Sequence, residues 1–172
     1  FMARRAPKQN KTSTQRKEKD MPQIMSGYFN GKTTGTPLCA LIANTDQHSQ
    51  DYSNLSRLAR PGHADYTGAL RYRGFNDVRG GGHFSGRLCF AGAVAGQILE
   101  KRGIYVGAHI AEIHGIKDKA FDPINTTKDM IREVREKEFP TIIDVQGNEM
   151  IKEIDKARKE KDSVGGIIEC IA

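Results

Sequence analysis

The stretch that decides how this chain is organised runs from residue 60 to residue 87 and reads RPGHADYTGALRYRGFNDVRGGGHFSGR. It opens on a Pro-Gly bend that places His63 between Arg60 and Asp65. Glycines interrupt the stretch repeatedly and helical periodicity is weak, which is typical of a long irregular segment that carries function. We therefore expect residues 45–84 to form an Arg/Gly-rich active-site segment between two regions of regular structure.

The region before this segment has the pattern of a β-hairpin. QIMSGYF (23–29) and LCALIAN (38–44) are strand-like, and Asn30-Gly31 between them is a strong turn signal. We expect the hairpin to occupy residues 21–44. Residues 1–20 are polar and basic, and we expect a loop there.

The region after the segment, residues 85–172, has the pattern helix-strand-helix-helix-strand. Ser85 is a suitable N-cap for a helix that runs to about Arg102, and Gly103 is a suitable stop. The remaining elements follow in chain order: a strand over IYVGAHIAEIHGI (104–116), a short helix capped by Thr126 and Asp129, an amphipathic helix over 148–161 and a final strand over SVGGIIECIA (163–172). Strands and helices in this order predict an α+β fold with antiparallel strands and packed helices.

Composition is that of a soluble globular protein in a reducing compartment. The chain has 172 residues, of which 37% are hydrophobic and 28% charged, so it is long enough for one domain with a core. The longest apolar stretch, FAGAVAGQIL (90–99), is too short to cross a bilayer. Cys39, Cys89 and Cys170 are widely spaced, which favours reduced thiols and a cytoplasmic location. Because both ends lack the usual start and stop signals, we expect a single partial domain.

Positive charge is concentrated in two places. The net charge is +6, and residues 1–20 hold seven Lys/Arg against two acidic residues. Between Lys32 and Lys101 there is no lysine, yet six arginines occur there: Arg57, Arg60, Arg71, Arg73, Arg79 and Arg87. A solvated surface would use both cations, whereas the planar guanidinium binds carboxylate or phosphate through two hydrogen bonds. We interpret residues 57–87 as an anion-binding wall, with Ser85 and Arg87 at a helix N-terminus that also favours negative charge.

A nucleic-acid-binding module is the alternative interpretation of the same charges. A basic tail and an Arg/Gly-rich tract are both typical of RNA-binding segments. However, the tract here is not repetitive and is interleaved with pieces such as HADY. A solvated tail and a purely structural unit are further readings that the charges leave open.

Five histidines occur, and their spacing predicts no zinc site. His109 and His114 lie in one expected strand at odd separation, so we expect both to be structural or solvent-facing. His63 differs, because the Pro-Gly bend fixes its ring beside arginine and aspartate. An imidazole held in that way is suited to give a proton to an anionic ligand near neutral pH.

These motifs resemble one known family. The stretch from 60 to 87, together with RRAPKQNKTSTQRKEKDMPQIMSG (4–27) and GKTTGTPLCALIANTDQHSQDYS (31–53), is similar to chorismate synthase almost continuously from residue 4 to 103. SVGGIIECIA (163–172) resembles the family again, and residues 115–160 form a variable region.

The resemblance implies a lyase of the shikimate pathway, which leads to the aromatic amino acids. Such an enzyme converts 5-enolpyruvylshikimate 3-phosphate to chorismate and phosphate by a 1,4-anti elimination. Such an enzyme is a flavoprotein that requires reduced FMN, although the reaction involves no net oxidation. The family enzyme is a cytoplasmic homotetramer with a β-α-β sandwich, and it has no nucleic-acid or membrane partner.

The resemblance also assigns roles to particular residues. His63 matches the histidine beside the reduced flavin, where it supplies a proton. Arg60 and Arg87 match arginines that bind the substrate's phosphate and carboxylates, and Ser85 matches a serine of the pocket. In the basic stretch, Lys11 and Arg16 match further substrate-binding cations.

The chain departs from the family in completeness. The family's first segment, with a GESHG-like motif and a second catalytic histidine, and its C-terminal half, which supplies most flavin contacts, have no counterpart in this sequence. We therefore expect the 172 residues alone to be inactive, to bind FMN weakly or not at all, and to associate through exposed apolar surface.

Overall fold

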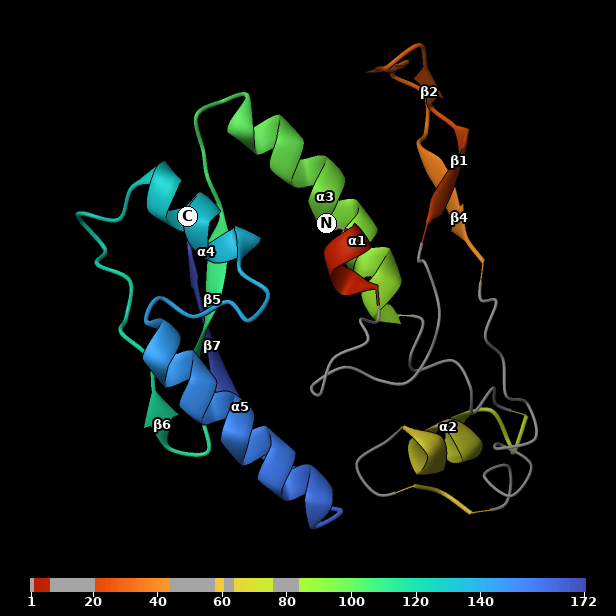
Figure 1. Cartoon of the computed structure of the whole chain (residues 1–172). Coiled ribbons are helices and arrows are strands. Elements are labelled where there is room, and N and C mark those ends of the chain that lie inside the picture. Colours follow the sequence, from red (N-terminus) through yellow and green to blue (C-terminus); the bar gives the residue numbers. More distant parts are fainter. Residues whose placement is uncertain (1, 7–20, 44–57, 61–63, 76–83) are drawn as a thin grey trace. The chain divides into compact units, whose positions relative to one another are not determined.

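The structure, a computed structural model, describes residues 2–6, 21–43, 58–60, 64–75 and 84–172 (Figure 1). The chain divides into two compact units, and the division along the main part of the chain falls between Val94 and Ala95. Unit 1 contains the elements up to that point, and unit 2 contains those after it. Each unit is described by itself.

Unit 1 contains two small antiparallel sheets. Strand β1 (Pro22–Ser26) pairs with β4 (Cys39–Ile42), and β2 (Tyr28–Phe29) pairs with β3 (Lys32–Thr33). Asn30 and Gly31 link β2 to β3 with φ angles of 45° and 79°, which is the two-residue turn that an Asn-Gly pair favours. The predicted hairpin over residues 21–44 is therefore confirmed, with a bulge in β1 that lets the tip form its own pair.

Two helices of unit 1 differ from the sequence expectation. Helix α1 (Met2–Arg5) lies within the stretch 1–20 that we expected to be loop. Helix α2 (Asp65–Arg71) lies within the segment 45–84 that we expected to be irregular. After α2 the chain turns through Arg73 and Gly74, both at positive φ, and the N–H of Gly74 donates to the carbonyl of Ala69. This left-handed C-terminal turn ends the helix after two turns, which is too short for a periodicity signal.

Helix α3 (Phe84–Glu100) is the longest helix among the described residues and crosses the division between the units. It ends where the sequence predicts. Gly103 has a φ of 79°, and the N–H of Ile104 donates to the carbonyl of Leu99, which is the hydrogen bond of a Schellman motif. Its start at Phe84 is two residues earlier than a Ser85 N-cap would give, so Ser85 lies inside the first turn rather than at the N-cap.

Unit 2 is built on a three-stranded antiparallel sheet in the order β6-β5-β7. Strand β5 (Gly107–Ile113) pairs along its length with β7 (Gly166–Ile171), and a bulge between Ile110 and Glu112 shifts the register. The expected single strand over residues 104–116 is wrong in one respect. The chain reverses at His114 and Gly115, both at positive φ, and β6 (Ile116–Lys117) returns beside β5. His114 therefore lies in a turn and not in the strand that carries His109.

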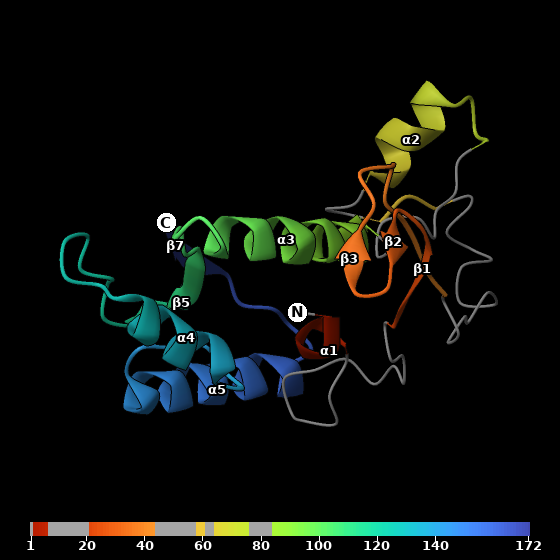
Figure 2. The same cartoon turned by 90° about the horizontal axis from the view of Figure 1, so that it is seen from above.

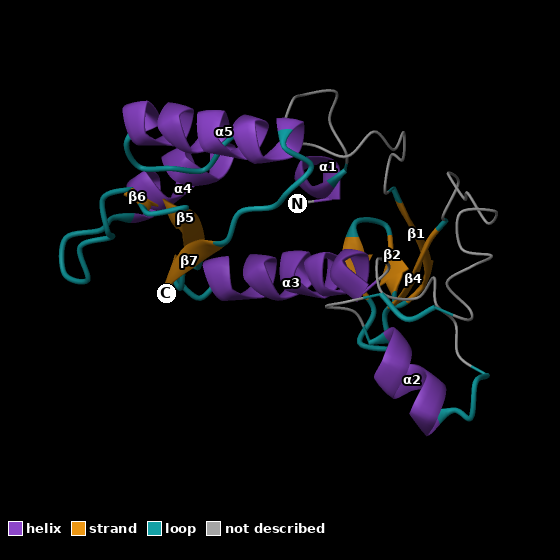
Figure 3. Cartoon of the chain, turned by 90° about the horizontal axis from the view of Figure 1, so that it is seen from below, coloured by secondary structure: helices purple, strands orange, loops and turns teal. Residues whose placement is uncertain are grey.

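Helices α4 (Lys128–Glu136) and α5 (Asp144–Lys159) both contact β5 and lie on the same side of the β5–β7 pair (Figures 2 and 3). The N-cap of α4 is Thr127, whose hydroxyl accepts from the N–H of Met130, and not the expected Thr126. Helix α5 begins four residues before the expected start at residue 148. Its predicted apolar face is confirmed, because Met150 and Ala157 are buried.

The core of unit 2 lies between these helices and the sheet. Its buried apolar side chains are Phe121, Ile131, Val134, Met150 and Ala157. Ile131 packs directly against the backbone of Gly107, where a Cβ atom would collide with it. Two polar side chains, those of His109 and Thr141, are also fully buried in this core.

Large apolar side chains are nevertheless exposed, including Phe75 in unit 1 and Ile167 and Ile168 on β7. Exposed apolar surface was expected from the sequence; association through it remains a prediction. Within the described residues, no helix combines the length and hydrophobicity that a membrane crossing requires.

Candidate functional site

The first candidate site lies at the start of α2, where Arg60 and Asp65 form a two-point ion pair. Nε of Arg60 donates to Oδ2 of Asp65 at 2.8 Å, and Nη2 donates to Oδ1 at 3.0 Å. The backbone N–H of Arg60 also donates to Oδ2 at 3.1 Å. The Asp65 side chain is only 8% exposed, whereas that of Arg60 is 28% exposed. Because three donors meet one nearly buried carboxylate, this pair holds Arg60 to the first residue of α2.

The pair also explains why α2 begins where it does. Ala64 precedes the helix and provides no side-chain cap. Asp65 is the acidic residue of the first turn, where a carboxylate interacts favourably with the helix dipole. The sequence predicted a cation and an anion around His63, and the structure shows that these two bind each other.

The second candidate position is the start of α3, which carries Ser85 and Arg87. Arg87 lies in the first turn and is exposed, and this turn contains no acidic residue. A cation at the positive end of a helix dipole is unfavourable unless an anion offsets it. An anionic ligand at this end would receive the helix N–H groups and the guanidinium together.

Three of the predicted site residues, His63, Lys11 and Arg16, lie outside the described residues. Their convergence with Arg60 and Arg87 therefore stays a prediction. Among the described residues, no group of three His, Cys, Asp or Glu side chains is arranged to hold a metal ion.

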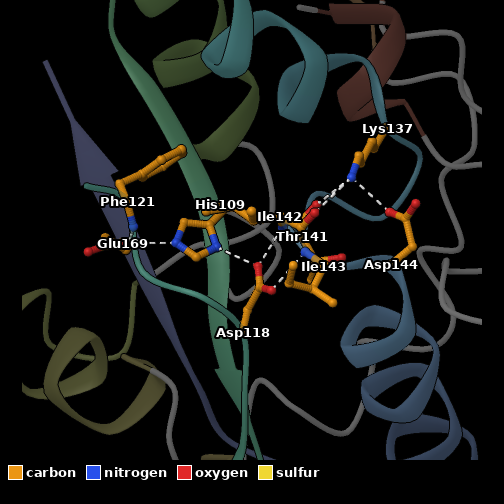
Figure 4. Close-up of polar contacts among 9 residues, drawn as sticks. All are labelled: His109, Asp118, Phe121, Lys137, Thr141, Ile142, Ile143, Asp144 and Glu169. Carbon is orange, nitrogen blue, oxygen red and sulfur yellow. Dashed lines mark hydrogen bonds and ion pairs between the residues drawn. The ribbon is translucent and has the colours of Figure 1, made fainter. Parts of the chain in front are cut away.

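A polar cluster that the sequence did not indicate lies in unit 2, around His109 (Figure 4). Nδ1 of His109 lies 2.9 Å from Oδ2 of Asp118, and Nε2 lies 2.6 Å from Oε2 of Glu169. The imidazole is fully buried, and the ring of Phe121 meets it edge-on with centroids 4.6 Å apart. Glu169 is the register partner of His109 across β5 and β7, so both side chains project from the same face of the sheet.

The two carboxylates of this cluster also accept backbone N–H groups. Asp118 accepts from Ile142 and Ile143, at the entrance of α5, and Glu169 accepts from Phe121 at 2.8 Å. Burial raises the pKa of Asp118, but the N–H donors and His109 together outweigh burial and lower the pKa below its ordinary 3.8. The N–H of Phe121, followed by His109, lowers the pKa of Glu169 below its ordinary 4.5. Both groups are therefore carboxylates at neutral pH.

The arrangement around His109 holds segments together and is closed to ligands. The imidazole is 0% exposed and both of its nitrogens have protein partners. We expected His109 to be either structural or solvent-facing, and the structure confirms the structural role. No local signal could have identified the partners, because Glu169 lies 60 residues away.

The chain is similar to known proteins along its whole length. The family model of chorismate synthase matches residues 1–172. A chorismate synthase of Korarchaeum cryptofilum is 46% identical over 98% of this chain, and one of Pyrococcus abyssi is 45% identical over 93%. These alignments cover 46% and 44% of the two relatives, so the chain spans about half the length of the curated relatives it matches.

The fold has a counterpart among solved structures. A crystal structure of chorismate synthase superposes on 88% of this chain with a TM-score of 0.65 at 21% sequence identity, and 44% of that structure is covered. This likeness confirms the α+β fold with antiparallel strands that the sequence predicted.

Proposed function

Because the chain belongs to the chorismate synthase family, we propose that this protein converts 5-enolpyruvylshikimate 3-phosphate to chorismate and phosphate. In this 1,4-anti elimination the bond between the ring carbon and the phosphate oxygen breaks, a ring hydrogen leaves from the opposite face, and a new double bond forms. The protein is then a carbon-oxygen lyase of aromatic amino-acid biosynthesis. A cytoplasmic location and assembly as a homotetramer belong to the same proposal.

The single observation that carries this proposal is the family match over residues 1–172, which includes the Arg/Gly-rich segment. The charge of the substrate supports it. A phosphate and two carboxylates require several cations at once, and residues 57–87 supply arginines where lysine is absent. The same match favours the enzyme over the nucleic-acid-binding module that the basic charges alone left open.

The residues of the proposed site have distinct tasks. Arg87 and Arg60 bind the anionic groups of the substrate, with Lys11 and Arg16 from the basic stretch as further cations. Ser85, which belongs to the first turn of α3, is proposed as the serine of the pocket. His63 holds a proton at a ring nitrogen, and the ion pair between Arg60 and Asp65 joins two residues that flank it in the sequence.

Reduced FMN is the proposed cofactor. Guanidinium and imidazole groups are the donors that an anionic reduced flavin and its phosphate require, so the residue types of this segment fit the group. When bound, reduced FMN supplies an electron that is returned within each turnover. In this chain, His63 is the residue that we place beside it.

An assay on the complete reading frame that encodes this chain tests the proposal. The purified protein is mixed with substrate and chemically reduced FMN without oxygen, and chorismate and phosphate are measured together. Equal amounts of both products are expected, and none should form with oxidised FMN. Phosphate release without chorismate would replace the proposal with a simple phosphatase. A parallel assay of the 172 residues alone tests the expectation that they are inactive and bind FMN weakly or not at all.

A further inference from the structure

The His109 cluster joins four parts of unit 2 that are far apart in sequence. His109 lies on β5 and Glu169 on β7, while Asp118 and Phe121 lie between β6 and α4. Through the N–H groups of Ile142 and Ile143, Asp118 also holds the segment that enters α5. One imidazole therefore connects both long strands to the two connections that lead into the helices (Figure 4).

The chemistry of the acceptors determines what the imidazole must carry. An ionised carboxylate accepts hydrogen bonds and donates none. Each ring nitrogen of His109 faces such an oxygen, at 2.9 Å and 2.6 Å. A neutral imidazole has a proton on one nitrogen and a lone pair on the other, and in a fully buried ring that lone pair would face a carboxylate at hydrogen-bond distance. Only the doubly protonated ring satisfies both contacts.

Cations on α4 and on the segment between α4 and α5 have partners of their own. From the segment between α4 and α5, Nζ of Lys137 binds the carbonyls of Thr141 and Ile142 and Oδ1 of Asp144. From α4, Arg135 binds Glu100 and the carbonyl of Val106, and Arg132 lies over the ring of Tyr105. Among the described residues, the two negatively charged groups that contact His109 are therefore Asp118 and Glu169.

We propose that His109 is a buried imidazolium that acts as a pH-responsive lock, holding the β5–β7 pair to the segments that enter α4 and α5. The lock is closed while Asp118 and Glu169 are ionised and His109 carries both protons. Protonation of the carboxylates removes its two acceptors. Because the folded-state pKa values of both carboxyl groups lie below their ordinary 3.8 and 4.5, the carboxylate part of the lock is complete above these ordinary values and is lost as the pH falls below them. This proposal is independent of the enzymatic one.

Nitrogen NMR of the histidine side chains in the full chain tests the charge state directly. At pH 7 the two ring nitrogens of His109 should both show the signature of a protonated nitrogen. The resonances are assigned by their loss in His109→Gln. In Glu169→Gln, whose side chain is 32% exposed in the native protein, Nε2 should lose this signature because its carboxylate is gone. A neutral tautomer of His109 at pH 7 in the unsubstituted chain would overturn the proposal.

Urea unfolding across pH 3 to 7 tests the lock itself. At pH 7, His109→Gln should raise the unfolding equilibrium constant about tenfold or more. As the pH is lowered from 4.5 to 3, the unfolding equilibrium constant of this variant should increase less steeply than that of the unsubstituted chain, because the lowered carboxyl pKa values depend partly on His109. His114→Gln is the matched control, because His114 lies in the exposed β5–β6 turn, and it should keep the full acid dependence. An acid dependence in His109→Gln equal to that of the control would contradict the lock.

Discussion

Asp118 and Ile143 are joined by a hydrogen bond from the backbone N–H of Ile143 to Oδ1 of Asp118, 2.9 Å long, across 25 residues. Ile143 is the N-cap residue of α5 and offers no side-chain cap of its own. Instead, a carboxylate from the segment after β6 accepts the backbone N–H groups of the N-cap residue and of the residue before it. The start of α5 is set by a tertiary contact and not by a local capping residue.

Replacement of Asp118 by Asn should destabilise unit 2 by about 3 kcal/mol. The substitution removes a fully buried charge that binds His109 and two backbone N–H groups. The measurement is urea unfolding at pH 7 followed by circular dichroism. Asp129→Asn is the control, because that side chain is 76% exposed and its ion pair with Arg132 spans 3.9 Å. We expect the control to change stability by no more than about 0.5 kcal/mol.

The same variant should alter the acid dependence of stability. The folded-state pKa values of Asp118 and Glu169 are depressed, so their stabilisation is complete above 3.8 and 4.5 and falls as the pH drops below these values. Asp118→Asn should retain only the part that comes from Glu169. An unchanged slope between pH 5 and 3 would show that Asp118 is not a source of acid sensitivity.

Two glycine substitutions should have opposite effects. A Cβ atom at Gly147, in the first turns of α5, would collide with Oγ1 of the fully buried Thr141. Gly147→Ala should therefore cost about 1–3 kcal/mol in spite of its better helix propensity. Gly92, inside α3, has open space around a Cβ atom, so Gly92→Ala should stabilise its helix by about 0.5–1 kcal/mol. Thermal unfolding of both variants shows whether side-chain packing or helix propensity dominates at each position. If both substitutions stabilise the protein, the side chain of Thr141 moves away from residue 147 at little cost.

Removal of the Asp65 charge should loosen the start of α2. In Asp65→Asn the guanidinium of Arg60 loses its two-point partner, and the expected local cost is about 1–3 kcal/mol. The N–H of Gly68, which donates to the carbonyl of Ala64, reports this locally. Its hydrogen exchange should become at least about tenfold faster. Unchanged exchange would mean that the ion pair does not stabilise the start of α2.

Features set by local chemistry were predicted well. Asn30-Gly31 and Gly103 were identified as turn and stop because few other residues adopt positive φ without strain. Helix α2 was missed because seven residues with Gly68 inside give too little periodicity. The cap of α4 was assigned one residue early, since Thr126 and Thr127 are equally suited by type and only the backbone geometry selects Thr127.

Features set by distant contacts were not predictable. The start of α5 was predicted at residue 148 from its apolar face, whereas the helix begins at Asp144 and contains Gly147, which leaves room for the side chain of Thr141. The partners of His109 come from positions 118 and 169, which only the pairing of β5 with β7 and the β6 reversal bring together. At the candidate substrate site, residue types and the family resemblance predict roles for Arg60 and Arg87, and these roles stay predictions. The sequence did not reveal that Arg60 is bound by Asp65.

The most direct test of the proposed function compares two arginines at opposite ends of α3. Arg87 lies in its first turn and Arg102 just after its last, and both are exposed. Using the protein encoded by the complete reading frame, chorismate formation is measured against substrate concentration with saturating reduced FMN. Arg87→Ala should lower kcat/KM at least about a hundredfold through loss of a charge-assisted contact to the substrate, while Arg102→Ala should leave it within about twofold. Equal activity of the two variants would contradict the assignment of Arg87 to the substrate, and no chorismate from the folded, unsubstituted protein would contradict the proposed function.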